Sequence, residues 1–275
     1  MRIMIDAPTG RHHWERAVEF GAHGRVAAAR TVLDEVAAAA GTSAAVTSLA
    51  ASTRGSLIRQ AGGHRAARAA DGRACGLASA AATGQGGPWL AAAWVDGLVG
   101  LAADGLGVAD FAGSRALLDR ADRFLGEHFP PGPDEAGEEL EWCTVPRVRL
   151  RVSWVRTEWG LYSGDLDTAR SASAASQILA ERLPSPRHRL KTELIAAAVA
   201  AAAGDTPGAR RAAREVFDRT GELGLAPLRW AAATLLTGVT PGGGEYPAEA
   251  DRLRAILARR GMPIAPLTLG ERHGR

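Results

Sequence analysis

Apolar residues recur along most of the chain at the spacing of amphipathic helices. The longest stripe runs at steps of three or four positions through Val145, Val148, Val152, Val155, Trp159 and Tyr162. Residues at this spacing share one face of an α-helix, and that face packs against a neighbour. Roughly a fifth of the chain is Ala, the strongest helix former, whereas runs of β-branched residues are scarce. The pattern predicts an all-α protein.

Capping and stop signals divide the chain into segments of helix length. Ser185-Pro186 and Thr206-Pro207 each combine a capping hydroxyl with a proline suited to the first helical position. Glycines such as Gly164 and Gly204 accept the left-handed conformation that ends a helix. These signals predict six antiparallel helix pairs: 12–22 with 24–40, 43–61 with 63–79, 88–105 with 110–127, 142–163 with 165–183, 186–203 with 206–222, and 226–237 with 246–260.

Several predicted turns inside a pair have a glycine followed five residues later by an alanine. The positions are Gly24 and Ala29, Gly62 and Ala67, Gly164 and Ala169, Gly204 and Ala209, and Gly243 and Ala248, with Gly107 and Ala112 fitting less well. The glycine turns the chain, and the small residue lets the two helices approach closely. The clearest intervals between these glycines are 38 to 40 residues. A period near 39 is typical of helical repeat arrays, in which each pair covers the apolar face of the next.

The segment Gly164-Asp165-Leu166-Asp167-Thr168-Ala169 resembles the Gly-Asp-x-x-x-Ala turn of the tetratricopeptide-repeat superfamily, and residues 204–209 are similar. Other matching residues are Ala17, Phe20, Gly24 and Ala29 in the first unit and Gly55, Gly62, Ala67 and Ala74 in the second. The period exceeds the roughly 34 residues of that family, and the family's Trp, Leu-Gly and closing Pro signals are mostly absent. The resemblance implies an α-solenoid of about six antiparallel helix pairs. The repeat units of large bacterial transcription activators and signalling ATPases look similar.

The segment 126–141 interrupts the helical pattern. It contains three Pro, three Gly and six acidic residues without any Lys or Arg, and this composition excludes a regular helix over most of its length. We expect three helix pairs in 1–128, an acidic loop at 129–141, three pairs in 142–261 and an irregular tail at 262–275, all in one continuous array. The loop is either a solvated insertion or an acidic strap over basic residues of the next helix.

The charge balance is close to neutral, with 33 basic and 30 acidic residues and a formal net charge of +3. Lys191 is the only lysine. We interpret the many arginines as codon bias on solvated faces, with an anion-binding or nucleic-acid-binding surface as the alternative. The first residues lack the apolar core of a signal peptide, and the longest apolar run, 194–203, is shorter than the about 20 residues of a membrane span. We expect a soluble, cytoplasmic protein.

Known motifs for catalysis and for metal or cofactor binding are not found in the sequence. It has no G-x-x-x-x-G-K-[ST] loop, no H-E-x-x-H and no C-x-x-C, and Ser163 stands one place too late for a nucleophile elbow. Cys75 and Cys143 are far apart and have no paired His or Cys nearby, so we interpret them as small buried residues. We therefore predict no catalytic, metal-binding or cofactor-binding residue, and a protein that is not an enzyme.

One group of residues on the predicted helix 142–163 suggests a binding surface. Four arginines lie around a tryptophan: Arg147, Arg149, Arg151 and Arg156 with Trp154. The resemblance to tetratricopeptide-like arrays implies that the first helix of each pair lines a concave groove. Arginine beside an aromatic residue is typical of interface hot spots. We predict a partner-binding groove that contains these residues and Arg54. The alternative is structural, with Trp154 in the core and the arginine stems covering its edge.

The leading functional hypothesis is a non-catalytic scaffold or adaptor that binds a protein or an acidic peptide in this groove. It rests on architecture, which is a weak guide to function. A transcriptional or signalling regulator with an Arg-rich surface for nucleic acid or another anion is the first alternative, and a helical enzyme with a cryptic pocket is the second. We expect no membrane partner, and a homodimer is compatible with the sequence.

Overall fold

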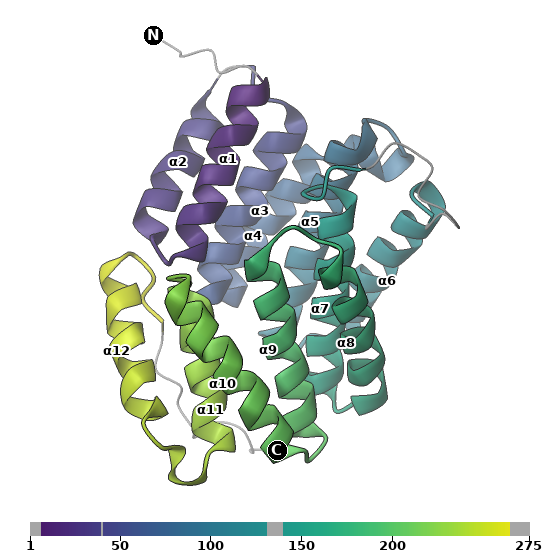
Figure 1. The fold of residues 1–275 in the computed structure, drawn as a ribbon. Coiled ribbons are helices and arrows are strands. Elements are labelled where there is room, and N and C mark those ends of the chain that lie inside the picture. The colour runs from purple at the N-terminus through teal and green to yellow at the C-terminus, as the bar shows by residue number, and fades with distance from the viewer. Residues whose placement is uncertain (1–6, 40, 131–139, 265–275) are drawn as a thin grey trace.

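The computed structural model describes residues 7–39, 41–130 and 140–264, which form twelve α-helices and no strand (Figure 1). They follow one another in pairs: α1 (Ala7–Ala22) with α2 (Val26–Ala38), α3 (Ala44–Gln60) with α4 (His64–Leu77), α5 (Gly87–Leu106) with α6 (Phe111–His128), α7 (Val145–Ser163) with α8 (Leu166–Glu181), α9 (Pro186–Ala202) with α10 (Thr206–Glu222), and α11 (Ala226–Val239) with α12 (Tyr246–Arg259). Short 3₁₀ helices, η1 (Ser79–Thr83) and η2 (Pro241–Gly243), precede α5 and α12. The predicted all-α class and the packing of helices in adjacent pairs are confirmed.

The predicted helix boundaries differ from the structure by more than two residues only at the starts of α1 and α7. Helix α7 starts at Val145 because Pro146 suits the first turn, where an amide hydrogen is not needed. The preceding residues 142–144 form a turn. Residues 131–139 of the expected acidic loop and 265–275 of the expected tail lie outside the described residues.

Four of the turns inside a pair use the predicted glycine and alanine. The glycines with positive φ are Gly24, Gly62, Gly164 and Gly204. The fully buried alanines are Ala29, Ala67, Ala169 and Ala209. An aspartate follows Gly164 and Gly204, and its carboxylate accepts a hydrogen bond from the first turn of the next helix. The predicted capping role of Thr206 is therefore wrong, because Asp205 caps α10 instead.

The turn of the third pair is built from other residues than predicted. Ala109, with φ of 61°, takes the left-handed conformation in place of Gly107. Ser114 occupies the buried position, whereas Ala112 is exposed. In the last pair Ala248 is exposed as well. One spacing of turns therefore does not extend through the whole chain.

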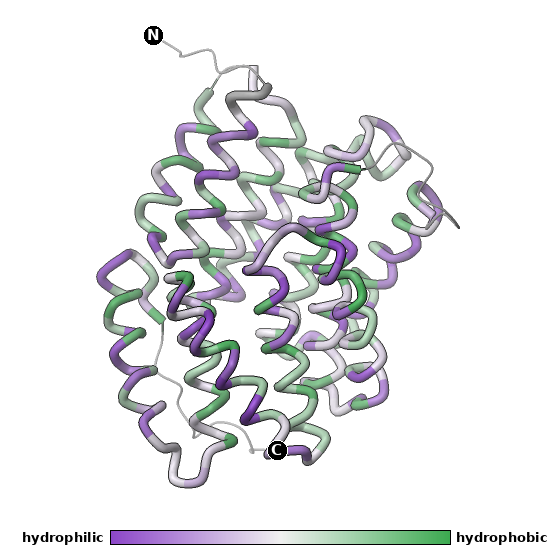
Figure 2. The backbone as a smooth tube through the Cα atoms, in the orientation of Figure 1, coloured by the Kyte–Doolittle hydropathy of each residue, from purple (hydrophilic) through white to green (hydrophobic). Residues whose placement is uncertain are grey.

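The odd-numbered helices form an inner layer and the even-numbered helices an outer layer. Helices α3, α5, α7 and α9 each contact the odd-numbered helices before and after them, and the even-numbered helices of the described chain share no comparable contact with one another. Figure 2 shows hydrophobic and hydrophilic residues alternating along the outer helices α10 and α12, as expected of helices with one buried face. This arrangement is compatible with a helical repeat.

Helix α5 is the central element and is apolar on nearly all sides. It packs against α3, α4, α6 and α7. By length and hydropathy this helix would suffice to span a membrane, but 78% of its apolar 18-residue segment is buried inside the fold. A helix enclosed by four others needs an apolar surface all round, so burial in the core accounts for its composition.

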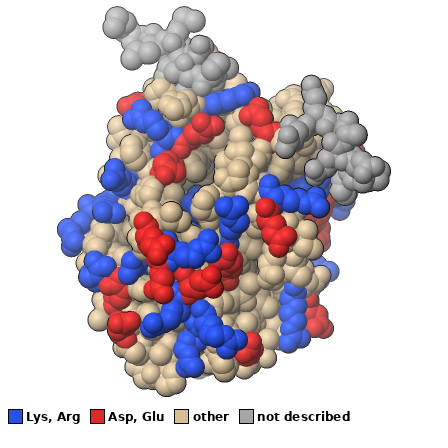
Figure 3. Space-filling model, in the orientation of Figure 1, with Lys and Arg blue, Asp and Glu red and all other residues tan. Residues whose placement is uncertain are grey.

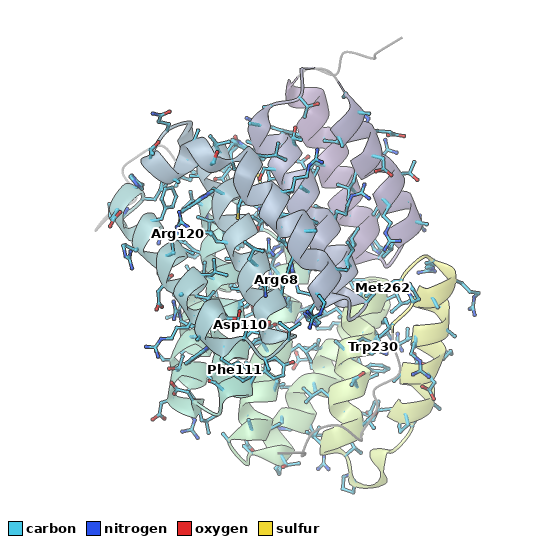
Figure 4. The ribbon with its side chains drawn as sticks, turned by 180° about the vertical axis from the view of Figure 1, so that it is seen from behind. Arg68, Asp110, Phe111, Arg120, Trp230 and Met262 are labelled. Atoms are coloured by element: carbon cyan, nitrogen blue, oxygen red, sulfur yellow. The ribbon has the colours of Figure 1, made fainter. Side chains whose placement is uncertain are left out.

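The first and last helix pairs contact each other. In Figure 1, α11 and α12 lie end-on below α1 and α2. The backbone N–H of Ala27 donates to the carbonyl oxygen of Arg260 at 2.9 Å. Ala22 packs into the core formed by α9 to α12, while Trp230 and Met262 pack with the core of the N-terminal helices (Figure 4). The two ends of the series of pairs are therefore joined.

Gly24 makes this junction sensitive to a single methyl group. It has a φ of +72°, and a Cβ atom there would collide with Leu257 and lie 3.3 Å from Cδ of Pro227. Gly62 is a matched control, because its φ is +90° and a Cβ atom added there would meet no other atom within 4 Å. Both substitutions to Ala carry the same backbone strain, so we expect Gly24→Ala to lower the free energy of unfolding by about 1–3 kcal/mol more than Gly62→Ala. Urea denaturation measures the free energy of unfolding of both variants. Equal losses in the two variants would show that Gly24 is not packed against Leu257 and Pro227.

Candidate functional site

The structure places the four predicted arginines on two faces of α7. Arg147 and Arg151 extend to α5, where both pair with Asp96. Arg149 and Arg156 extend to α6 instead. Arg149 donates to carbonyl oxygens at the end of that helix, and Arg156 pairs with two of its aspartates. Only Arg147 and Arg151 therefore share an inner surface.

The other two predicted residues lie elsewhere. Trp154 is buried between α7 and α9, where its indole N–H donates to the hydroxyl of Thr192 at 2.8 Å. Its ring stacks on that of His188, with 5.4 Å between centroids. Arg54 pairs with Asp34 of α2. Trp154 thus holds α7 against α9, and Arg54 belongs to a separate ion pair near the surface.

Asp96 of α5 is the centre of a buried ion cluster that joins α3, α5 and α7. Its side chain is only 3% exposed. Its Oδ1 accepts from Nη1 of Arg147 at 3.2 Å and pairs with Arg151, while Oδ2 accepts from the hydroxyl of Ser52 at 3.2 Å. Burial of a carboxylate is tolerated when it is paired and hydrogen-bonded in this way. Because two guanidinium groups share one carboxylate, the cluster has an excess of positive charge.

A second buried ion cluster lies between α3, α4 and α5. Nη1 of Arg59 is 2.8 Å from Oδ2 of Asp71 and 2.5 Å from Oδ1 of Asp104, and both aspartate side chains are 0% exposed. Gly55 and Gly100 leave the room that Asp71 needs, since a Cβ atom on either would collide with its carboxylate. One guanidinium between two carboxylates gives this cluster an excess of negative charge.

Burial raises the pKa of Asp71 to about 6 from its ordinary 3.8; Arg59 opposes this shift and the carboxylate of Asp104 adds to it. Burial also raises the pKa of Asp104. Because the pKa is higher in the folded chain, the stabilisation from the bound proton is complete below pH 3.8 and is lost as the pH rises through about 6. At neutral pH the second cluster therefore carries a destabilising negative charge.

Four cations of α7 and α9 gather on the inner layer and are termed the basic cluster: Arg147, Arg151, Arg187 and Lys191. The two members on each helix are four residues apart and share one face of it. Burial lowers the pKa of Lys191 to about 8; Glu158 opposes this shift, and repulsion by Arg151 and Arg187 adds to it. Burial also lowers the pKa of Arg187, with Glu19 opposing and Arg147 adding to the shift. The four positive charges are thus close enough to repel one another.

The two α9 cations have few anionic partners. The side chain of Arg187 makes no hydrogen bond or ion pair with any other residue that the structure describes. Nζ of Lys191 is 4.0 Å from Oε1 of Glu158, the outer limit of an ion pair, and 4.5 Å from the centroid of the Trp154 ring. The Lys191 side chain is 38% exposed and Arg187 is half-buried, so both side chains are partly open to solvent.

The basic cluster supplies hydrogen-bond donors and positive charge for an anion. His188 lies beside it, but burial and the surrounding cations lower its pKa to about 2, so its ring is neutral. Nδ1 of that ring is 2.7 Å from the hydroxyl of Ser185, the residue that caps α9. Among the described residues no group of His, Cys, Asp and Glu is placed to hold a metal ion. The described side chains of the basic cluster therefore offer positive charge and N–H donors.

Arg187 and Lys191 are not among the predicted groove residues, although the sequence contains a signal for them. The first six residues of α9 read Pro-Arg-His-Arg-Leu-Lys, without an acidic residue in the first turn. Acidic residues are favoured there because the amino end of a helix carries partial positive charge. Lys191 is also the only lysine among 33 basic residues. Most of the described helices also lack an acidic residue in the first turn, so only the single lysine distinguishes this helix end.

Comparison with known protein families, with curated proteins and with solved structures finds no match to this chain. The resemblance to the tetratricopeptide-repeat superfamily therefore rests on the turn motifs and on the adjacent helix pairs. The site is accordingly interpreted from its own geometry and charge.

Replacing Arg59 with Gln leaves two buried carboxylates without a counter-ion. We expect this variant to lose about 3–5 kcal/mol of unfolding free energy at pH 8. Asp71→Asn instead leaves a one-to-one pair of Arg59 with Asp104. It should be at least as stable as the wild type at pH 8 and lose any advantage at pH 5, where Asp71 already holds a proton. Urea unfolding at both pH values measures the free energy of unfolding of each variant. The charge imbalance would be contradicted if Asp71→Asn were destabilised relative to the wild type more at pH 8 than at pH 5.

The ionisation of Lys191 can be measured directly, because reductive ¹³C-methylation of the chain labels only this side chain and the α-amino group. We expect an NMR titration midpoint near 8 rather than the ordinary 10.5. Arg187→Gln removes a repelling charge and should raise the midpoint, while Glu158→Gln removes an attracting one and should lower it. A wild-type midpoint near 10.5 would show that the amine is not confined among cations.

Proposed function

We propose that this protein is a non-catalytic, tetratricopeptide-like scaffold whose inner helix layer binds an acidic segment of a protein partner. The proposal treats the helix pairs as an α-solenoid with a period near 39 residues. The observation that carries it is the incomplete neutralisation of the basic cluster. The Arg187 side chain has no hydrogen-bond or ion-pair partner among the described residues. Lys191 has one distant carboxylate, that of Glu158, and the face of the Trp154 ring. Carboxylates of a partner would supply the missing counter-charges.

The geometry of the two cations suits an extended acidic segment. Arg187 and Lys191 are one helical turn apart, about 5–6 Å along the axis. Carboxylates on alternate residues of an extended chain are about 7 Å apart, on one face. A guanidinium group can bind a carboxylate through two parallel hydrogen bonds. Arg147 and Arg151 are already held by Asp96, so they strengthen the local field without having to be ordered on binding.

The distribution of charge favours an acidic protein segment over a nucleic acid. Figure 3 shows Asp and Glu side chains interspersed with Lys and Arg over the visible face, and the net charge is only +3. Nucleic acids are usually bound by a continuous basic surface that contacts many phosphates. A role in transcription or signalling would therefore depend on protein contacts.

Affinity capture from the native host, followed by mass spectrometry, tests this proposal. The informative variant is Arg187→Gln with Lys191→Gln, and its matched control is Arg65→Gln with Arg123→Gln, two exposed arginines on α4 and α6. We expect the wild type and the control to enrich the same partner, and the inner-layer variant to lose it. The scaffold proposal fails if the wild type enriches no protein above the bare matrix. If both double variants behave alike, the basic cluster is not the contact.

A further inference from the structure

We propose that a cavity between α10 and the start of α12 binds a small organic phosphate ester. The cavity has a volume of about 500 Å³, which lies within the range of small-molecule pockets. Three arginines of α10 line it, together with Glu245 and Tyr246 at the start of α12. None of the four residues of the basic cluster lines this cavity, so the inference does not rest on the proposed function.

The arginines that line the cavity are Arg210, Arg211 and Arg214. The first two precede Arg214 by four and three positions, so the three side chains share one face of α10. The side chains of Arg210 and Arg211 make no hydrogen bond or ion pair with any other residue that the structure describes. Two guanidinium groups without an internal acceptor therefore stand beside one cavity, and an anionic ligand would supply the acceptors.

Arg214, the third arginine, is oriented by the start of α12. Its Nη2 donates to the phenolic oxygen of Tyr246 and lies 3.6 Å from Oε1 of Glu245. The Tyr246 ring is itself fixed, because it is buried and packs edge-on against Phe217 with 5.6 Å between the ring centroids. Nε and Nη1 of Arg214 have no acceptor among the described residues. A guanidinium group that is already oriented loses less conformational freedom when it binds a ligand.

The charge and the volume of the cavity together favour an organic phosphate. Three arginines and the carboxylate of Glu245 leave an excess of two positive charges in the lining. A phosphate monoester carries close to two negative charges at neutral pH, and its three terminal oxygens can accept from several guanidinium groups at one point. The phosphate group itself, at about 30 Å³ for each of its five non-hydrogen atoms, fills about a third of the cavity. The remainder leaves room for the organic group of the ester.

Isothermal titration calorimetry of the full chain with phenyl phosphate tests the site. We expect saturable binding by the wild type. Arg210→Gln with Arg211→Gln should weaken it at least about tenfold, because charge-assisted hydrogen bonds are lost. The matched control, Arg65→Gln with Arg123→Gln on α4 and α6, should bind as the wild type does.

Two variants at the start of α12 test the geometry of the site. Glu245→Gln removes a carboxylate that competes for Arg214 and should tighten phenyl phosphate binding about threefold. Tyr246→Phe keeps the ring packed against Phe217 but removes the oxygen that orients Arg214, so it should weaken binding by about the same factor. Circular dichroism of both variants should match that of the wild type, which shows that the change in affinity does not come from unfolding.

Three results would overturn the inference. The first is the absence of saturable binding at millimolar phenyl phosphate, and the second is equal affinity in the Arg210 and Arg211 double variant and its control. The third is binding of benzoate as tightly as phenyl phosphate at the same ionic strength, because benzoate offers one charge and two oxygens. Arg187→Gln with Lys191→Gln should leave phenyl phosphate binding unchanged, and a loss of affinity in this variant would place the ligand at the basic cluster instead.

Discussion

Two carboxylates carried into the core by α5 constrain the packing of the helices around it. Asp96 and Asp104 are almost completely buried in a helix that is otherwise apolar, so each needs a cation from a neighbouring helix. Arg59 of α3 pairs with Asp104, and Arg147 and Arg151 of α7 pair with Asp96. These pairs fix how α3 and α7 lie on α5. Buried ion pairs of this kind contribute more to a unique arrangement than to net stability.

The ion pairs are not balanced one to one, and the imbalance has opposite signs on the two sides of α5. The Arg59 cluster has a surplus carboxylate, whereas the basic cluster has surplus cations. Asp71 and Arg151 attract each other across this boundary, but that attraction leaves Arg187 without a partner among the described residues. The surplus lies at the amino end of α9, where the partial positive charge of the helix end adds to it.

Local signals in the sequence were sufficient for the helices and insufficient for the site. The glycine turns predict the starts of α8 and α10 because a positive-φ glycine acts within a few residues, although the cap of α10 is Asp205 and not the predicted Thr206. The inner and outer faces of α7 could not be separated in this way. Leu150 and Trp154 are buried on the side of α7 opposite the stripe that starts at Val145, so no single apolar face marks its buried side. Only contacts with α5, α6 and α9 determine which arginine lies where. Asp71 and Asp104 likewise give no local sign that they will share Arg59.

The junction between the first and last helix pairs changes how the chain should unfold. In a linear array each unit contacts only its neighbours, so the end units fray independently. Here the hydrogen bond from Ala27 to Arg260 and the contacts of Trp230 and Met262 make each end a cap for the other. Unfolding of either terminal helix pair would expose the apolar surface that the other terminal pair buries against it. The six pairs should therefore unfold as one cooperative unit, and removing or adding a helix pair at either end would remove the mutual cap.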